Sequence, residues 1–250
     1  MSGGAGPIGF DPSPFRAWRR TAGLFLDFDG TLSEIVARPE LARPRPEIPG
    51  ILGRLIERYA LVAVVSGRPP EQVRRLVPVD GLLTIGLYGL PEDAPPLPPQ
   101  VVEEARQVAA GIGGARVEEK GSSVAVHYRG AANVEQARRA LLPRLEAVAR
   151  GHELRLMAGR NVLELVPLEV PGKGAVVAGE TQRRGLEACL FAGDDRADVD
   201  AFQALDQLKR RGLHTVKVAV ASGESPDELL RQADVVVTGP QGLAELLETL

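Results

Sequence analysis

The segment LFLDFDGTLSE, residues 24–34, decides the fold. Its apolar run ends in two aspartates, Asp27 and Asp29, with one residue between them, and Gly30 and Thr31 follow at once. A continuous rather than alternating apolar run is typical of a strand buried on both faces of a parallel sheet. Because a strand can end at Asn, Gly or Pro without any charge, the paired carboxylates indicate either a solvated turn or a reaction centre.

Similar apolar runs recur along the chain, and stretches with helical spacing separate them. The runs are LVAVVS, LLTIGLYG, ACLFAGDD, VKVAVAS and DVVVTG, at residues 61–66, 82–89, 188–195, 216–222 and 234–239. The helical stretches are residues 49–59, 70–77, 197–212 and 226–233. This order predicts an α/β fold with a Rossmann-like parallel sheet that helices cover on both faces.

A proline-rich break, LPEDAPPLPPQ at residues 90–100, introduces a different pattern. Helical stretches follow at residues 101–112 and 133–150, and strand segments at 115–120, 122–130, 153–159 and 161–167. Strands that alternate apolar and polar residues are typical of an antiparallel sheet with one covered face. We therefore predict an inserted α+β domain, residues 90–166, between two parts of the core domain, residues 1–89 and 167–250.

Composition limits the classes of partner. The chain has 250 residues, 44% of them hydrophobic, which is enough for a sizeable core. The net charge of −3 favours a small-molecule or protein partner, and we expect binding to neither nucleic acid nor membrane. Without a long apolar segment or a signal-like start, we expect a cytoplasmic protein, and we expect a monomer. The first twenty residues are rich in Gly and Pro and then basic, which predicts a loosely held N-terminal arm.

Metal chemistry, if present, must use oxygen ligands. The single cysteine, Cys189, lies in an apolar run and is interpreted as a buried strand residue. The three histidines, His127, His152 and His214, lack the spacing of a zinc site. Asp194 and Asp195 follow another predicted strand and offer the carboxylate oxygens that Mg²⁺ prefers.

The polar residues at the strand ends suit phosphoryl transfer. Asp27 is ionised at neutral pH and can attack phosphorus without an activating base, while Asp29 can give a proton to the leaving oxygen and later take one from water. The backbone amides of Gly30 and Thr31 can face phosphate oxygens. Ser66, at the end of the second predicted strand, can donate to phosphate, and Lys173, at a helix start, can neutralise developing charge.

These residues resemble the four motifs of the haloacid dehalogenase-like phosphatases. The matching segments are DFDGTL, SGR, a Lys-Gly helix start and GDD, in this order over residues 23–250. The resemblance implies that Asp27 is the nucleophile, Asp29 the acid and base, and Lys173 a phosphate ligand. It also implies phosphate contacts from Ser66, Gly67, Gly30 and Thr31, and Mg²⁺ held by Asp27, Asp29, Asp194 and Asp195.

The inserted domain resembles that of the trehalose-6-phosphate phosphatases. The segments that carry this are VEEKGSSVAVHYRGA, NVLELVPLEVPGKG and FAGDDRADVDAF. The resemblance implies a hydrolase of trehalose biosynthesis whose aspartyl-phosphate intermediate releases phosphate from trehalose 6-phosphate. It implies further that Arg68, Lys120, His127, Arg129 and Glu164 contact the sugar phosphate, that Asp198 supports the metal, and that the inserted domain is a cap.

Five positions depart from the family's pattern and leave the substrate open. They are Tyr88, Pro91, Val166, Ala197 and Val199. Other sugar phosphates, such as mannosyl- or glucosyl-3-phosphoglycerate or sucrose phosphate, are alternatives. A phosphomutase would share the aspartates, and a catalytically silent sugar-phosphate-binding module would share the altered recognition residues.

Overall fold

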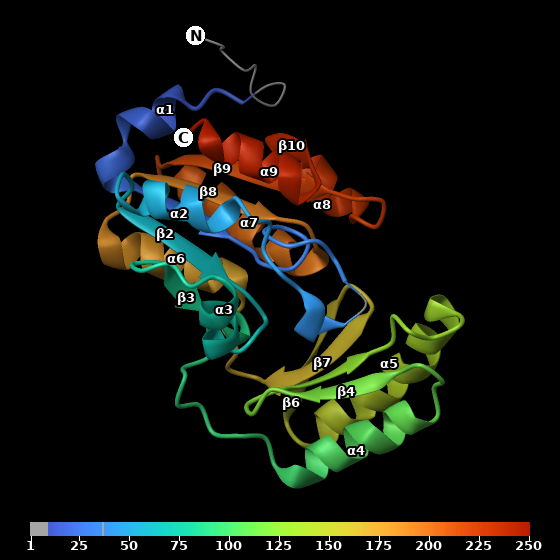
Figure 1. Ribbon diagram of the computed structural model, residues 1–250. Helices are drawn as coiled ribbons and strands as arrows, with labels where there is room; N and C mark the ends of the chain where they lie inside the picture. The colour runs from blue at the N-terminus through green and yellow to red at the C-terminus, as the bar shows by residue number, and fades with distance from the viewer. Residues whose placement is uncertain (1–9, 37) are drawn as a thin grey trace. The chain divides into compact units, whose positions relative to one another are not determined.

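A computed structural model describes residues 10–36 and 38–250, which form two compact units (Figure 1). The core unit combines the residues up to Gly89 with Pro171–Leu250, and the inserted unit is Leu90–Val170. The inserted unit thus ends at Val170, whereas the sequence placed its end at residue 166. In the described part of the chain, none of the helices has the length and apolar character needed to cross a bilayer.

The core unit is built on a six-stranded parallel sheet, which confirms the predicted α/β class. The strand order is β10-β9-β8-β1-β2-β3. The strands are β1 (Ala22–Leu26), β2 (Leu61–Val65), β3 (Leu83–Ile85), β8 (Ala188–Gly193), β9 (His214–Ala221) and β10 (Val235–Thr238). From β1 the chain continues to β2 and β3 on one side of the sheet, and from β8 it continues to β9 and β10 on the other. The switch in strand order therefore falls between β1 and β8.

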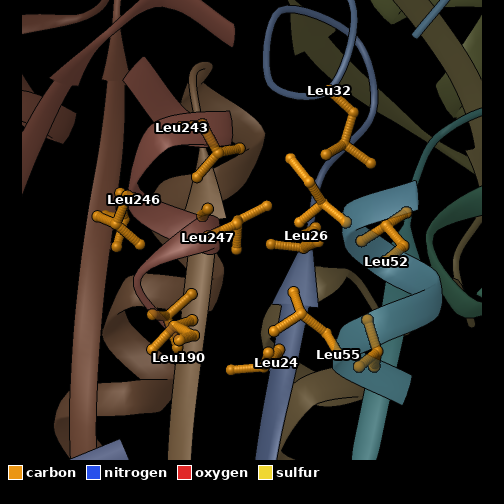
Figure 2. Packing of buried hydrophobic residues seen from close by; sticks show 14 of the residues in the cluster. Leu24, Leu26, Leu32, Leu52, Leu55, Leu190, Leu243, Leu246 and Leu247 are labelled. Carbon is orange, nitrogen blue, oxygen red and sulfur yellow. The ribbon is translucent and has the colours of Figure 1, made fainter. Parts of the chain in front are cut away.

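Helices cover both faces of this sheet. The helices of the core unit are α1 (Ser13–Ala17), α2 (Ile48–Ile56), α3 (Pro70–Leu76), α6 (Lys173–Arg184), α7 (Arg196–Arg210), α8 (Asp227–Gln232) and α9 (Gly239–Glu248). Leu24 and Leu26 of β1 belong to one apolar cluster with α2 and α9, whereas Phe25 belongs to a second cluster with α6, α7 and α8. Figure 2 shows the leucines of the first cluster gathered around β1. This burial on both faces explains the continuous apolar runs.

The inserted unit has an antiparallel sheet with one helix-covered face. Its strands, in the order β4-β5-β7-β6, are β4 (Arg116–Glu119), β5 (Val124–His127), β6 (Leu154–Gly159) and β7 (Val162–Pro167). Helices α4 (Pro99–Ala110) and α5 (Val134–Gly151) pack on the face that carries Val124, Val126, Leu163 and Leu165. The alternation of the sequence therefore separates a helix-covered face from a polar one, as predicted for an α+β domain.

Two local expectations were wrong. Residues 13–20 are not a loosely held arm, because Phe15 of α1 is fully buried and Arg16 donates to the carbonyl of Thr249; residues 1–9 of that arm lie outside the described residues. The run at 82–89 is a strand only over Leu83–Ile85. The 3₁₀ turn η3 (Leu87–Gly89) follows, in which Leu87 and Tyr88 have φ of 48° and 54°.

Candidate active site

The site lies where β1 and β8 end, at the switch in strand order. Leu26 pairs with Ala192, and the backbone N–H of Asp27 donates to the Ala192 carbonyl at 2.9 Å. The residues that follow the two strands, Asp27 and Asp194, are therefore neighbours although they are far apart in sequence. This position is where open parallel sheets bind ligands.

Asp27 and Lys173 form a buried ion pair at the centre of the site. The Lys173 Nζ lies 2.7 Å from Asp27 Oδ1 and 2.6 Å from Asp198 Oδ1. Burial raises the pKa of Asp27 to about 7, although the ammonium of Lys173 acts in the opposite direction. The expectation that Asp27 is fully ionised at neutral pH therefore does not hold for the metal-free site, because burial disfavours the charged carboxylate. Burial alone would lower the pKa of Lys173, but the carboxylates of Asp198 and Asp27 raise it above its ordinary value. Lys173 therefore stays charged beside Asp27.

The carboxylate of Asp198 binds both Lys173 and the backbone of the loop after β8. Its Oδ1 accepts from Lys173, and its Oδ2 accepts from the backbone N–H groups of Asp194 and Asp195, both at 2.9 Å. Asp195 and Asp198 form the capping box of α7, which satisfies two backbone donors at the helix start. The side chain of Asp195 thus caps a helix.

Three carboxylates at this point fit a divalent cation that prefers oxygen ligands. Asp27, Asp194 and Asp198 each offer a ligand oxygen, and these atoms lie within 4.8 Å of one another. Asp198 holds Lys173 with one oxygen and the loop after β8 with the other, so we expect it to support the site and Asp27 and Asp194 to be the direct ligands. Of the predicted ligands, Asp29 and Asp195 lie outside this group, and their role in binding metal stays a prediction.

The turn after β1 brings its backbone against Asp194. Gly30 has φ of 80°, and a Cβ there would lie 2.1 Å from Asp194 Oδ2, so only glycine fits. Thr31 Oγ1 donates to Asp194 Oδ1 at 3.2 Å. The N–H groups of Gly30 and Thr31, expected to face phosphate, donate here to the carbonyls of Ser33 and Phe28 and close the turn.

Asp29 points to a different partner from Asp27. Its carboxylate accepts two hydrogen bonds from Arg68, from Nε to Oδ2 at 2.7 Å and from Nη2 to Oδ1 at 2.6 Å. The Asp29 side chain is 45% exposed, whereas that of Arg68 is 7% exposed. Sequence reasoning missed this pair, because it assigned the two residues separate roles.

Ser66 and Gly67 follow β2 and complete the core residues. Ser66 is buried, and its Oγ accepts from the Arg68 backbone N–H at 3.2 Å, which leaves the hydroxyl proton able to donate. Gly67 lies against the Tyr88 ring, since a Cβ on Gly67 would be 2.4 Å from that ring. The left-handed turn that holds Tyr88 is bonded to this loop, because Tyr88 N–H donates to the Ser66 carbonyl at 3.1 Å.

The predicted residues of the inserted unit lie on the face of its sheet opposite the helices. Lys120 Nζ lies 3.0 Å from Glu164 Oε2, and Ser123 Oγ donates to Glu164 Oε1 at 2.6 Å. His127 Nε2 lies 2.7 Å from Glu118 Oε2. Arg129 is half-buried just beyond β5. The structure thus places a lysine–glutamate pair and a histidine–glutamate pair on one polar face.

Comparison with known sequences identifies relatives of the region that contains the candidate site. A family described as trehalose-phosphatase matches residues 25–236. A trehalose-phosphate phosphatase from Mycolicibacterium paratuberculosis is 37% identical over 205 residues, which cover 74% of this chain and 52% of that protein. A trehalose-phosphate phosphatase from Mycobacterium leprae is 30% identical over 254 residues, which cover 92% of this chain and 58% of that protein. The chain therefore spans little more than half the length of these curated relatives.

Comparison with solved structures supports the fold. The C-terminal domain of the C. albicans trehalose-6-phosphate phosphatase has a TM-score of 0.80 at 20% identity and covers 99% of this chain and 98% of that one. A haloacid dehalogenase-like hydrolase from Bacteroides thetaiotaomicron has a TM-score of 0.62 at 15% identity, and the match covers 91% of this chain and 98% of that one. The haloacid dehalogenase-like fold predicted from the motifs is confirmed.

Proposed function

The chain belongs to the trehalose-phosphatase family, a family of phosphoric monoester hydrolases, and we propose that it hydrolyses trehalose 6-phosphate to trehalose and inorganic phosphate. The observation that carries the proposal is the buried ion pair between Asp27 and Lys173, in which Asp27 lies beside Asp194 because the two aspartates follow the adjacent strands β1 and β8. A carboxylate held next to a permanent cation is suited to attack a phosphate dianion, since the cation offsets the repulsion between two anions.

In the first half-reaction, an Asp27 carboxylate oxygen attacks phosphorus and the bond from phosphorus to the sugar oxygen breaks. Protonated Asp29 gives its proton to that oxygen, so the sugar leaves as a neutral alcohol and Asp29 becomes a carboxylate. The phosphoryl group is then an aspartyl phosphate on Asp27. Lys173 offsets the negative charge that builds on the phosphoryl oxygens in the transition state.

In the second half-reaction, a water oxygen attacks phosphorus while the Asp29 carboxylate takes a proton from that water. The bond between phosphorus and Asp27 breaks, phosphate leaves, and both aspartates return to their starting states. Ser66 is proposed to hold a phosphate oxygen through its hydroxyl proton. A bound Mg²⁺, held by Asp27 and Asp194, would add positive charge at the phosphoryl oxygens.

Release of inorganic phosphate tests this proposal. Trehalose 6-phosphate, sucrose phosphate and a mannosyl-3-phosphoglycerate are each offered to the protein with Mg²⁺ and with a chelator. We expect release from trehalose 6-phosphate that the chelator abolishes and that Asp27→Asn lowers by at least about 10³-fold. Asp206→Asn is the matched control, because Asp206 also pairs with a lysine, Lys217 at 2.7 Å, but lies outside the site.

The other results of this experiment separate the alternatives. Release from a different sugar phosphate alone would retain the chemistry and overturn the trehalose assignment. Absence of release from every substrate would overturn the phosphatase proposal in favour of a sugar-phosphate-binding module.

Substrate recognition by the inserted unit belongs to the same proposal. We assign sugar contacts to Lys120, Glu164, His127 and Arg129, and Lys120→Met should raise KM for trehalose 6-phosphate more than it lowers kcat. The monomeric state, the cytoplasmic location and the absence of nucleic-acid and membrane partners stay predictions.

A further inference from the structure

We propose that Arg68 is a positioning residue, which fixes the carboxylate of Asp29 for both proton transfers instead of contacting the sugar phosphate. This inference rests on the proposed function. Its first observation is the pair of parallel hydrogen bonds from Nε and Nη2 of Arg68 to the two oxygens of Asp29, at 2.7 and 2.6 Å. A guanidinium that binds both oxygens of a carboxylate fixes its rotation as well as its distance.

The guanidinium is itself held by three further groups of the core unit. Nη1 donates to Oε1 of Gln72 in α3 at 2.9 Å, and Nη2 also donates to the carbonyl of Pro39 at 2.9 Å. The guanidinium carbon lies 5.3 Å from the ring centroid of buried Phe28, the residue between the two aspartates. Arg68 is therefore anchored before any ligand binds.

Asp29 needs such an anchor because it is the exposed member of the aspartate pair. Its side chain is 45% exposed, while that of Asp27 is 7% exposed. An exposed carboxylate at the end of a turn samples several rotamers, and a proton donor must lie within hydrogen-bond reach of the atom that it protonates. The buried Arg68 supplies this constraint on the Asp29 side chain.

The hydrogen bonds between Arg68 and Asp29 leave Asp29 able to take and give a proton. A carboxylate has about four lone-pair sites, and the two bonds to Arg68 use two of them. An oxygen of Asp29 can thus accept a proton from water, or hold one for the leaving oxygen, while Arg68 keeps its plane fixed. A lysine could replace the charge of Arg68 but not the two parallel N–H groups.

A double-mutant cycle tests whether Arg68 acts through Asp29. The variants are Arg68→Met, Asp29→Asn and the combination, assayed with trehalose 6-phosphate and Mg²⁺. We expect Arg68→Met to lower kcat by about 100-fold with KM within about threefold of wild type. In the Asp29→Asn background, the same substitution should change kcat by less than about threefold. An equal loss in both backgrounds, or a loss confined to KM, would overturn the inference.

The leaving group provides a readout that a merely structural role would not give. Nitrophenolate leaves without a proton, so the burst of nitrophenolate from p-nitrophenyl phosphate should persist in Arg68→Met and in Asp29→Asn. A burst lost in Arg68→Met alone would show general damage to the site and would overturn the positioning role. This readout remains measurable even where Asp29→Asn has no steady-state turnover.

Two further variants complete the experiment. Arg68→Lys should lose more than about tenfold in kcat, and full activity in this variant would overturn the need for two parallel bonds. Arg45→Met is the matched control, since Arg45 pairs with Glu47 at 2.6 Å in the same unit, and it should keep the wild-type kcat. Absence of phosphate release by the wild-type protein would instead overturn the proposed function. Failure of the proposed function can therefore be distinguished from failure of the positioning role of Arg68.

Discussion

Asp27→Asn should stabilise the metal-free protein although it removes the proposed nucleophile. Burial raises the pKa of Asp27 from 3.8 to about 7, so the folded state disfavours the ionised carboxylate. One pKa unit corresponds to about 1.4 kcal/mol, and the shift of roughly three units gives an upper value of about 4 kcal/mol. Because Asn keeps an oxygen that can accept from Lys173, we expect a gain of about 2–4 kcal/mol.

The expected gain depends on pH in a defined direction. The folded pKa of Asp27 lies above the unfolded one, so its contribution to stability is fully present below about pH 4 and is lost as the pH rises to about 7. Asp27→Asn does not titrate, and its advantage should therefore grow across this window. At about 2–4 °C per kcal/mol for a chain of this size, the melting temperature should rise by roughly 4–16 °C at about pH 8.

Thermal unfolding followed by circular dichroism in a chelator measures this gain. Asp206→Asn, which removes a carboxylate from a partly exposed pair, is the control and should melt near the wild type. Mg²⁺ at one hundred times its dissociation constant should stabilise the wild type by about 2.7 kcal/mol and the variant by less. Mg²⁺ should therefore reduce the difference in melting temperature between the variant and the wild type. A metal-free Asp27→Asn protein that melts at or below the wild-type temperature would refute the reasoning.

Three further predictions concern residues outside this pair. The buried Cys189, whose pKa burial raises to about 11 and whose Sγ lies 3.1 Å from Thr181 Oγ1, should react with a thiol reagent only after denaturant is added; rapid labelling of the native protein would contradict this. Asp200→Ala should cost about 1–2 kcal/mol in thermal unfolding, because the Asp200 carboxylate accepts from the Gly174 N–H at 2.8 Å and caps α6; an unchanged melting temperature would contradict it. Phe15→Ala should cost about 3–5 kcal/mol by the same measurement, whereas a loosely held arm would cost nothing.

The sheet and the position of the site could be predicted from the sequence because they depend on local patterns. Apolar runs that end in DFD, SGR and GDD indicated both the strands and the edge where their polar residues meet. Asp27, Lys173 and Asp194 do meet there. By contrast, helix α9 carries Leu243, Leu246 and Leu247 at helical spacing, but its Gly- and Pro-rich start hid the pattern.

The pairing of side chains within the site could not be predicted. Arg68 and Asp29 each suit a ligand, and their mutual contact depends on how the loop after β2 is folded. That loop is hydrogen-bonded to two left-handed residues, because the N–H groups of Leu87 and Tyr88 donate to the carbonyls of Arg68 and Ser66. No local pattern predicts two consecutive bulky residues with positive φ, because the conformation is unfavourable for both. Asp198 likewise matched a motif, but its simultaneous bonds to Lys173 and to the start of α7 required the packed helices.

The order of the strands has a consequence for synthesis on the ribosome. The inserted unit completes its sheet within one continuous segment, Leu90–Val170, and can fold as soon as that segment emerges. Strand β1 must wait, because its partner β8 is made only after the whole insertion. Until β8 is made, any sheet that β1 to β3 form has β1 as an apolar edge without its neighbour on that side. The strand that leads into the proposed nucleophile is thus open to mispairing in the nascent chain.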